Sequence, residues 1–192
     1  MTENREYDAR EARKRLKQFL TGKTGERLFV QQIPHPSTPT GLCYCDNSVF
    51  RTIGMCFKAW LLETLLQLPF DGPKLWFLRR LGARIGKNVH IAAGAWIDPL
   101  YTQLLTIEDN VFIGMHTKIF MHEYRINEFR VGKITIRTGS FIGGSAIIGC
   151  GIEVGEGATV AAGTVLGCDV PPRSTIGGNP PRIIKRNERP SS

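Results

Sequence analysis

Histidines are the side chains of this 192-residue chain best suited to exchange a proton near neutral pH, and there are four of them. We expect little chemistry from His35, in the proline-rich stretch IPHPSTPT, from His90, beside an expected strand, or from His116, whose ring should point off the surface. His122 differs, because it opens the stretch FMHEYRINEFRVGK, residues 120–133, where a six-residue repeat stops. A histidine at the root of such a loop could act as a general base.

Glu123 follows this histidine directly and completes the candidate catalytic pair. Its carboxylate could orient the His122 ring or bind a substrate. Neighbours in an extended chain point to opposite sides, so the orienting role stays open. The alternative for His122 is a corner residue hydrogen-bonded to backbone.

The elements that must position these residues follow from the six-residue repeat. Aliphatic residues recur at every sixth position in three groups: Ile85, Ile91 and Ile97; Ile107, Ile113 and Ile119; and Ile136, Ile142, Ile148, Val154, Val160 and Leu166. Neither a helix nor an ordinary strand has this period, and a β-sandwich would alternate with period two. Very short strands joined by tight turns do have it, with one aliphatic side chain pointing inward per strand. The repeat therefore predicts a mainly β protein, a parallel β-helix.

Two interruptions of the repeat indicate its geometry. The step from Ile97 to Ile107 is ten residues and that from Ile119 to Ile136 is seventeen. Each follows a group of three, so with three strands per coil both leave from the same corner of a triangular prism. Corner loops tolerate insertions because only the strands must stack. We therefore expect about four coils over residues 85–170.

Charge and cysteine content limit the partners and the compartment. The formal charge of +8 is compatible with a phosphate-bearing partner, an anionic membrane surface, nucleic acid or simple solubility. No nucleic-acid-binding motif is present, so we expect no nucleic acid partner. The five cysteines are odd in number and lack C-x-x-C spacing, which favours reduced thiols in a cytoplasmic protein. The N-terminus is too charged for a signal peptide.

The C-terminal part of the chain resembles a known family. The run from residue 134 to residue 186, with Pro171-Pro172, Gly178-Asn179-Pro180 and the basic segment RIIKR, is similar to the maltose and galactoside O-acetyltransferase branch of the hexapeptide-repeat acyltransferases. The resemblance covers about residues 81–186. It implies a left-handed parallel β-helix, acetyl-CoA as acyl donor, no metal, and a homotrimer with active sites between subunits.

The resemblance also implies roles for individual residues. His122 would be the general base, and the residues expected to contact CoA are Phe141, Gly144, Ala162, Arg182 and Lys185. Asp98 and Tyr124 are the candidate acceptor-binding residues. The expected reaction is acetyl transfer to a hydroxyl of a sugar or glycan.

Three alternatives stay open at this point. The adjacent His-Glu pair is also similar to that of amino-sugar N-acetyltransferases, so an amine acceptor is possible. A β-helix without catalysis would serve as an assembly subunit. A zinc-dependent γ-type carbonic anhydrase would use His90, His116 and His122, although the His-x-x-x-x-His spacing of that family is absent.

The first 80 residues are expected to form a helical and loop segment. DAREARKRLKQFL predicts an amphipathic helix with a basic face, IPHPSTPTG a loop, and SVFRTIGMCFKAWLLETLLQL a more apolar helix. Lys58 and Glu63 interrupt the apolar stretch, which favours a packed helix over a membrane-surface anchor or a membrane span. This helix would cap the open end of the prism or help to bind a lipid-linked or polymeric acceptor.

The expected organisation is therefore an N-terminal segment at 1–80, a β-helix at 81–186 and a flexible tail at 187–192. We expect the insertion at 120–133 to reach toward a neighbouring subunit. The expected location is cytoplasmic, with peripheral membrane contact as a less favoured possibility.

Overall fold

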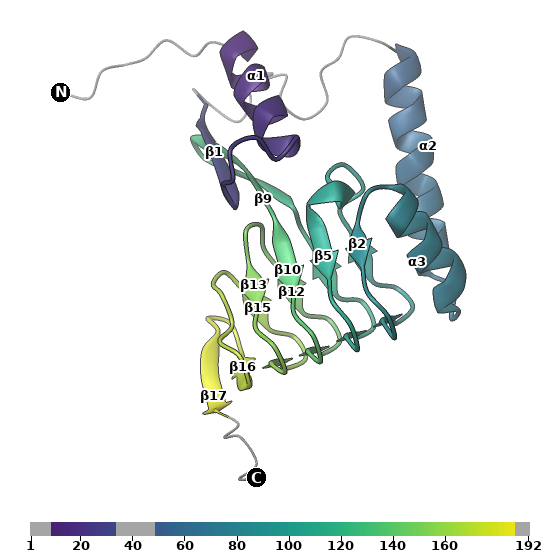
Figure 1. Ribbon diagram of the computed structural model, residues 1–192, viewed down its shortest axis with the longest axis vertical. Coiled ribbons are helices and arrows are strands. Elements are labelled where there is room, and N and C mark those ends of the chain that lie inside the picture. Colours follow the sequence, from purple (N-terminus) through teal and green to yellow (C-terminus); the bar gives the residue numbers. More distant parts are fainter. Residues whose placement is uncertain (1–8, 34–48, 187–192) are drawn as a thin grey trace, which may run out of the picture.

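The structure is a computed structural model, and it describes residues 9–33 and 49–186. The main body of the protein is a left-handed parallel β-helix, which Figure 1 shows as a stack of coils. The first face of the prism contains β2 (Arg84–Ile85), β5 (Leu105–Ile107), β10 (Ile134–Ile136) and β13 (Glu153–Val154). The second contains β3 (His90–Ile91), β6 (Phe112–Ile113), β11 (Phe141–Ile142), β14 (Thr159–Val160), β16 (Ser174–Gly177) and the antiparallel β17 (Arg182–Arg186). The third contains β4 (Trp96–Ile97), β7 (Lys118–Ile119), β12 (Ile147–Ile148) and β15 (Val165–Leu166).

The aliphatic residues of the repeat form the core, as the six-residue period predicted. On each face they pair in register from one coil to the next; Ile97, for example, pairs with Ile119, and Ile148 pairs with both Ile119 and Leu166. Eleven of the twelve are at most 2% exposed, and Ile85 in the first coil is half-buried. Because burying one such side chain contributes about 1.5–3 kcal/mol, this column is a major stabilising element of the prism.

Both interruptions leave from the corner between the third and the first face, as expected. The first connects β4 to β5 and contains a short 3₁₀ helix, η1 (Thr102–Leu104). The second contains β8 (His122–Arg125) and β9 (Glu128–Gly132), which form an antiparallel hairpin where the sequence suggested only a loop.

The hairpin is joined by a strand that the sequence did not predict. β1 (Leu28–Gln32) pairs antiparallel with β9, and this gives a three-stranded sheet with the order β1-β9-β8. The division at residue 80 stays a prediction, and β1 links the two sides of it. α1 (Ala9–Leu20) lies over this sheet (Figure 1), with Phe19 against Phe29 at 5.9 Å between ring centroids. The predicted amphipathic helix is confirmed.

Two helices close the N-terminal end of the prism beside β2 (Figure 1). α2 (Val49–Leu66) was expected, whereas α3 (Asp71–Arg80) was read only as a lead into the first coil. Gly72 and Pro73 are poor helix formers, so the sequence did not indicate α3. A proline is nevertheless tolerated in the first turn of a helix. Leu62, Leu66, Leu75 and Leu78 are buried at this end, and the Gly94 N–H donates to the Leu66 carbonyl at 3.0 Å. The apolar helix therefore lies at the end of the prism, as one of the two roles left open for it requires.

Some expectations fall on residues outside the described ranges. Most of the loop IPHPSTPTG and the tail at 187–192 belong to this group, as do Cys43 and Cys45. Within the described ranges, no helix has the length and apolar character that a membrane crossing requires.

Candidate active site

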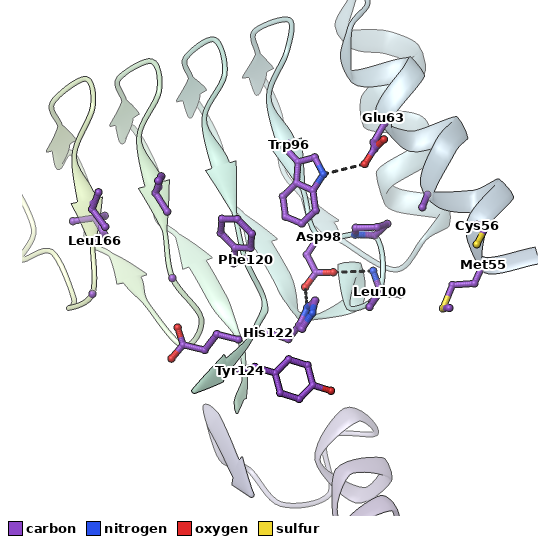
Figure 2. A pocket seen from close by; sticks show the side chains of 17 residues that line it. Met55, Cys56, Glu63, Trp96, Asp98, Leu100, Phe120, His122, Tyr124 and Leu166 are labelled. Carbon is purple, nitrogen blue, oxygen red and sulfur yellow. Dashed lines mark hydrogen bonds and ion pairs between the residues drawn. The ribbon is translucent and has the colours of Figure 1, made fainter. Parts of the chain in front are cut away.

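A cavity of about 780 Å³ lies between the third face of the prism and α2 (Figure 2). Its floor contains Trp96, Ile147 and Leu166 from the first, third and fourth coils, and Met55 and Glu63 from α2 form one wall. The corner that carries both interruptions forms the end of the cavity. Most of the lining is apolar, so polar groups inside it are few and specifically placed.

The central polar contact of this cavity joins His122 and Asp98 (Figure 2). Nδ1 of His122 is hydrogen-bonded to Oδ2 of Asp98, and the carboxylate is fully buried while the imidazole side chain is 16% exposed. The other carboxylate oxygen of Asp98 accepts the Leu100 N–H at 2.9 Å. A buried carboxylate in this position favours the tautomer with the proton on Nδ1, which leaves Nε2 as the basic nitrogen. The Tyr101 ring packs against the imidazole in a T-shaped arrangement, with 5.4 Å between the ring centroids.

The two interruptions of the repeat bring this pair together. Asp98 is the first residue after β4, and His122 lies three residues after the end of β7. β4 and β7 are neighbours on the third face, with Ile97 paired to Ile119. Residues that leave the same corner in adjacent coils must lie close in space. The sequence contained this signal, because both interruptions were already assigned to one corner.

Two sequence assignments change in the structure. Glu123 does not orient the histidine: its carboxylate accepts from Arg125 Nε at 2.9 Å and lies 3.8 Å from a guanidinium nitrogen of Arg130. Alternation along β8 turns it away from the His122 ring. Asp98 is not placed to touch the substrate that receives the acetyl group. Its side chain is fully buried, and both of its oxygens already accept hydrogen bonds. Asp98 takes the orienting position that had been left open for Glu123.

Tyr124 lies at the mouth of the cavity, where an acceptor contact is possible. It is two residues beyond His122 on β8, packs on Phe129 at 4.8 Å between centroids and keeps 41% of its surface exposed. Figure 2 shows its ring beside the His122 ring.

Sequence reasoning missed three further residues of the cavity. Nε1 of Trp96 donates to Oε1 of Glu63 at 3.0 Å, and the Trp96 ring packs on Phe120 at 4.8 Å between centroids. Trp96 and Phe120 each adjoin an inward aliphatic of the third face, so their outward position could have been read from the repeat. Glu63 had been read only as an interruption of an apolar helix, and its direction depends on how α2 docks.

Comparison with known proteins assigns the chain to a family. Residues 133–168 match the model described as "Hexapeptide repeat of succinyl-transferase". "Putative acetyltransferase YvoF" of Bacillus subtilis (strain 168) is 39% identical over 121 residues, which cover 62% of this chain and 70% of that protein. Galactoside O-acetyltransferase of Escherichia coli (strain K12) is 30% identical over 178 residues, 88% of this chain and 80% of that protein. The chain belongs to the hexapeptide-repeat acyltransferase family, in the branch of the maltose and galactoside O-acetyltransferases.

Solved structures agree on the fold. A hexapeptide-repeat-containing acetyltransferase of Vibrio cholerae O1 biovar eltor, complexed with acetyl coenzyme A, superposes with a TM-score of 0.59 at 21% identity and covers 75% of this chain and 93% of that one. A galactoside acetyltransferase in complex with coenzyme A gives a TM-score of 0.55 at 18% identity, covering 75% of this chain and 86% of that one.

Two of the five positions expected to contact CoA in this acyltransferase, Gly144 and Ala162, lie together, but away from His122. Gly144 and Ala162 stack at the corner between the second and third faces, where the Gly163 N–H donates to the Gly144 carbonyl at 2.9 Å. The coils approach closely there: a Cβ on Gly143 would come within 2.5 Å of the Ala162 nitrogen. This corner and the corner that carries His122 lie at opposite edges of the third face.

The other three expected CoA contacts lie on the second face. Phe141 is 45% exposed and stacks on Phe112 at 5.1 Å between centroids, with 8° between the ring planes. Arg182 and Lys185 are exposed on β17 at the far end of the same sheet. A single chain therefore holds the candidate base and the expected donor positions on different edges.

The histidines of the zinc alternative are not brought together. His90 is bonded to Asp71 at 2.6 Å, His122 is bonded to Asp98, and His116 is exposed at another corner. In the part of the chain that the structure describes, no group of three or more His, Cys, Asp or Glu side chains could hold a metal ion.

Burial shifts the pKa values of two ionisable groups near the cavity. Burial lowers the pKa of the Lys58 ammonium, and the charge of Asp98 opposes this shift in part. Burial raises the pKa of the Cys150 thiol to about 12, with a further contribution from the charge of Glu123. Cys150 is therefore a protonated thiol at neutral pH and no nucleophile. Cys56, Cys150 and Cys168, the cysteines among the described residues, form no disulfide.

Proposed function

We propose that this acyltransferase moves an acetyl group from acetyl-CoA to a hydroxyl of a sugar or glycan, with His122 as the general base and Asp98 as its positioning residue. The observation that carries the proposal is the hydrogen bond between the partly exposed imidazole and the fully buried carboxylate, at the end of a large cavity. The relatives named as acetyltransferases, together with the acetyl-CoA-bound structure of similar fold, support the donor.

The proposed chemistry requires one proton carrier. Nε2 of His122 takes the proton of the acceptor hydroxyl as its oxygen attacks the thioester carbonyl carbon. A backbone N–H stabilises the oxyanion that forms. The carbon–sulfur bond then breaks, and the CoA sulfur receives the proton from the imidazolium. The buried Asp98 carboxylate assists this cycle in two ways. It keeps the proton of the neutral His122 ring on Nδ1, and it stabilises the imidazolium that forms after proton transfer.

The lining of the cavity suits a sugar. Aromatic rings such as Trp96 and Tyr124 can pack on the apolar face of a sugar ring, and the Glu63 carboxylate can accept from its hydroxyls. A mostly apolar cavity with a few placed polar groups orients a ligand by those groups.

We further propose a homotrimer. The candidate base lies at one edge of the third face, whereas the expected CoA positions lie at its other edge and on the second face, so a site built from both needs the donor edge of a neighbouring subunit. The exposed stack of Phe112 and Phe141 on the second face supports such contact. A mass measured by light scattering at micromolar concentration tests this, and a fully active monomer would contradict it.

A panel of sugars, amino sugars and glycans, each incubated with acetyl-CoA, tests the proposed function. Free thiol release gives the rate, and mass spectrometry of the product distinguishes an ester from an amide. On a confirmed acceptor, His122→Ala should lower kcat by about 10²–10⁴. His116→Ala is the matched control and should cost far less. Wild-type turnover by His122→Ala would remove the proposed base.

A further inference from the structure

One wall of the cavity carries a carboxylate that takes no part in the proposed proton transfer. Glu63 lines the cavity from α2, and its Oε1 accepts the Trp96 indole N–H at 3.0 Å (Figure 2). In the part of the chain that the structure describes, the second oxygen, Oε2, has no hydrogen-bond or ion-pair partner. The side chain is exposed. Glu63 therefore presents an anchored carboxylate with one oxygen available to a ligand.

The docking of α2 decides where this carboxylate lies. The Leu66 carbonyl accepts the Gly94 N–H at 3.0 Å, just before β4. Glu63, three residues earlier on α2, is bonded to Trp96, two residues later in the prism. The helix therefore lies along β4 and runs in the opposite direction. Its direction places Glu63 beside the start of the strand.

Glu63 and the candidate base are held by the same short piece of chain. Glu63 is bonded to Trp96, and His122 is bonded to Asp98, two residues further along. Side chains two residues apart in an extended chain point to the same side, and their Cα atoms lie about 7 Å apart. Figure 2 shows Glu63 at the Trp96 end of this piece and His122 at the Asp98 end. The anchors of the two groups are thus separated by about the width of one sugar ring.

The other carboxylates of the lining are already engaged. Asp98 is bonded to His122, and Glu123 is bound by one arginine and lies near a second. The described residues that line the cavity include no lysine and no arginine. Glu63 is therefore the lining carboxylate that is left to interact with a ligand.

Two lysines lie near the cavity without lining it. Lys58 on α2 is half-buried, and its charge interacts with that of Asp98. Lys118 on β7 is the ladder neighbour of Trp96 and is exposed. Within the described ranges, neither forms an ion pair with Glu63. A ligand group that meets Oε2 therefore meets a negative charge, which favours hydrogen-bond donors and repels anions.

We infer that Glu63 determines which acceptors the enzyme uses. Its Oε2 accepts a hydrogen bond from a second group of the acceptor, a hydroxyl or an ammonium, on the same sugar residue as the hydroxyl that His122 deprotonates. The same carboxylate excludes sugars with a carboxylate at that position. The Trp96 N–H acts as the positioning group, because it fixes the direction of the Glu63 side chain. The inference rests on the proposed function, since it requires a sugar in the cavity.

The test compares wild type with Glu63→Gln on sugars that match the confirmed acceptor except at one position, which carries a hydroxyl, a hydrogen, an ammonium or a carboxylate. For wild type, one position should show a loss of kcat/KM of about tenfold or more with the carboxylate, and a smaller loss with the hydrogen. Glutamine can keep the Trp96 N–H on its oxygen, which turns its NH₂ group toward the ligand. Glu63→Gln should therefore raise the KM for the hydroxyl and ammonium forms about tenfold and lower it for the carboxylate form. The KM for acetyl-CoA and the kcat at saturating acceptor should stay near wild type.

Glu156→Gln is the matched control, because it removes the same charge at an exposed corner between the first and second faces and should behave like wild type. Equal use of the hydroxyl and carboxylate forms by wild type overturns the inference, as does an unchanged preference in Glu63→Gln. The proposed function fails separately: full turnover by His122→Ala removes the base, whatever Glu63 does. An inactive His122→Ala together with an unchanged preference in Glu63→Gln overturns this inference alone, and no turnover on any sugar overturns both.

Discussion

The substitution Asp98→Asn tests the proposed active site most directly. Asparagine has the shape of aspartate but replaces one carboxylate oxygen by an NH₂ donor. Its remaining oxygen can keep the Leu100 N–H, which turns the NH₂ group toward Nδ1 of His122. Nδ1 must then accept, and the ring proton moves to Nε2. The nitrogen that should take the acceptor proton already carries one.

The expected loss equals the contribution of the general base. That contribution is about 10²–10⁴ in rate, or about 2.7–5.4 kcal/mol of transition-state stabilisation at 1.36 kcal/mol per tenfold. The loss should appear in kcat. The KM for acetyl-CoA should stay near the wild-type value, since the Asp98 side chain is fully buried and acts through His122 without touching the donor.

The assay is the initial rate of CoA thiol release on the acceptor identified from the panel. Glu123→Gln is the matched control, because this carboxylate is bound by Arg125 and lies off the imidazole. Circular dichroism checks that both variants are folded. Full turnover by Asp98→Asn, or a larger loss in Glu123→Gln than in Asp98→Asn, would refute the assignment of the orienting residue.

Three further outcomes are expected. Replacing Arg182 and Lys185 together by Ala should raise the KM for acetyl-CoA more than it lowers kcat, because phosphate contacts act in ground and transition states alike; an unchanged KM would exclude both residues from the donor site. Cys150, with its pKa raised to about 12 by burial, should resist alkylation in the folded protein near pH 8 while exposed Cys168 reacts, and peptide mass mapping will show any exception. Burial opposes ionisation of Asp71, but hydrogen bonds from a backbone N–H, a histidine and a lysine outweigh it and lower its pKa below the ordinary 3.8. The stabilisation from Asp71 is therefore fully present above pH 3.8 and is lost as the pH falls through the lowered value, so urea unfolding should show Asp71→Asn destabilised at neutral pH and the gap closing in acid.

The sequence predicted the β-helix well because its signal is local. Each hexad carries its own inward aliphatic, and Ile136 or Val154 marks its strand whatever the other coils do. The interruptions could be counted in the same way, which assigned both to one corner. His122 stood out because it lies where the count breaks.

Elements that depend on distant partners were missed. β1 is a five-residue stretch whose pairing partner, β9, lies about a hundred residues further along the chain, and nothing near LFVQQ indicates it. The sequence did not indicate α3 because Gly72 and Pro73 have low helix propensity. Burial of Leu75 and Leu78 against the first coil stabilises this helix. Propensity alone could not show either element.

The choice between two acids shows where sequence reasoning ends. The six-residue period by itself determined the prism, its inward residues and the corner that carries the candidate base. Only the tertiary structure decided that Asp98, and not Glu123, contacts His122. The physical reason is that chain neighbours on a strand point to opposite sides, whereas residues that leave one corner in adjacent coils are held about 5 Å apart by the ladder of backbone hydrogen bonds. Adjacency in the stack, which no single stretch of sequence displays, selected the partner of the imidazole.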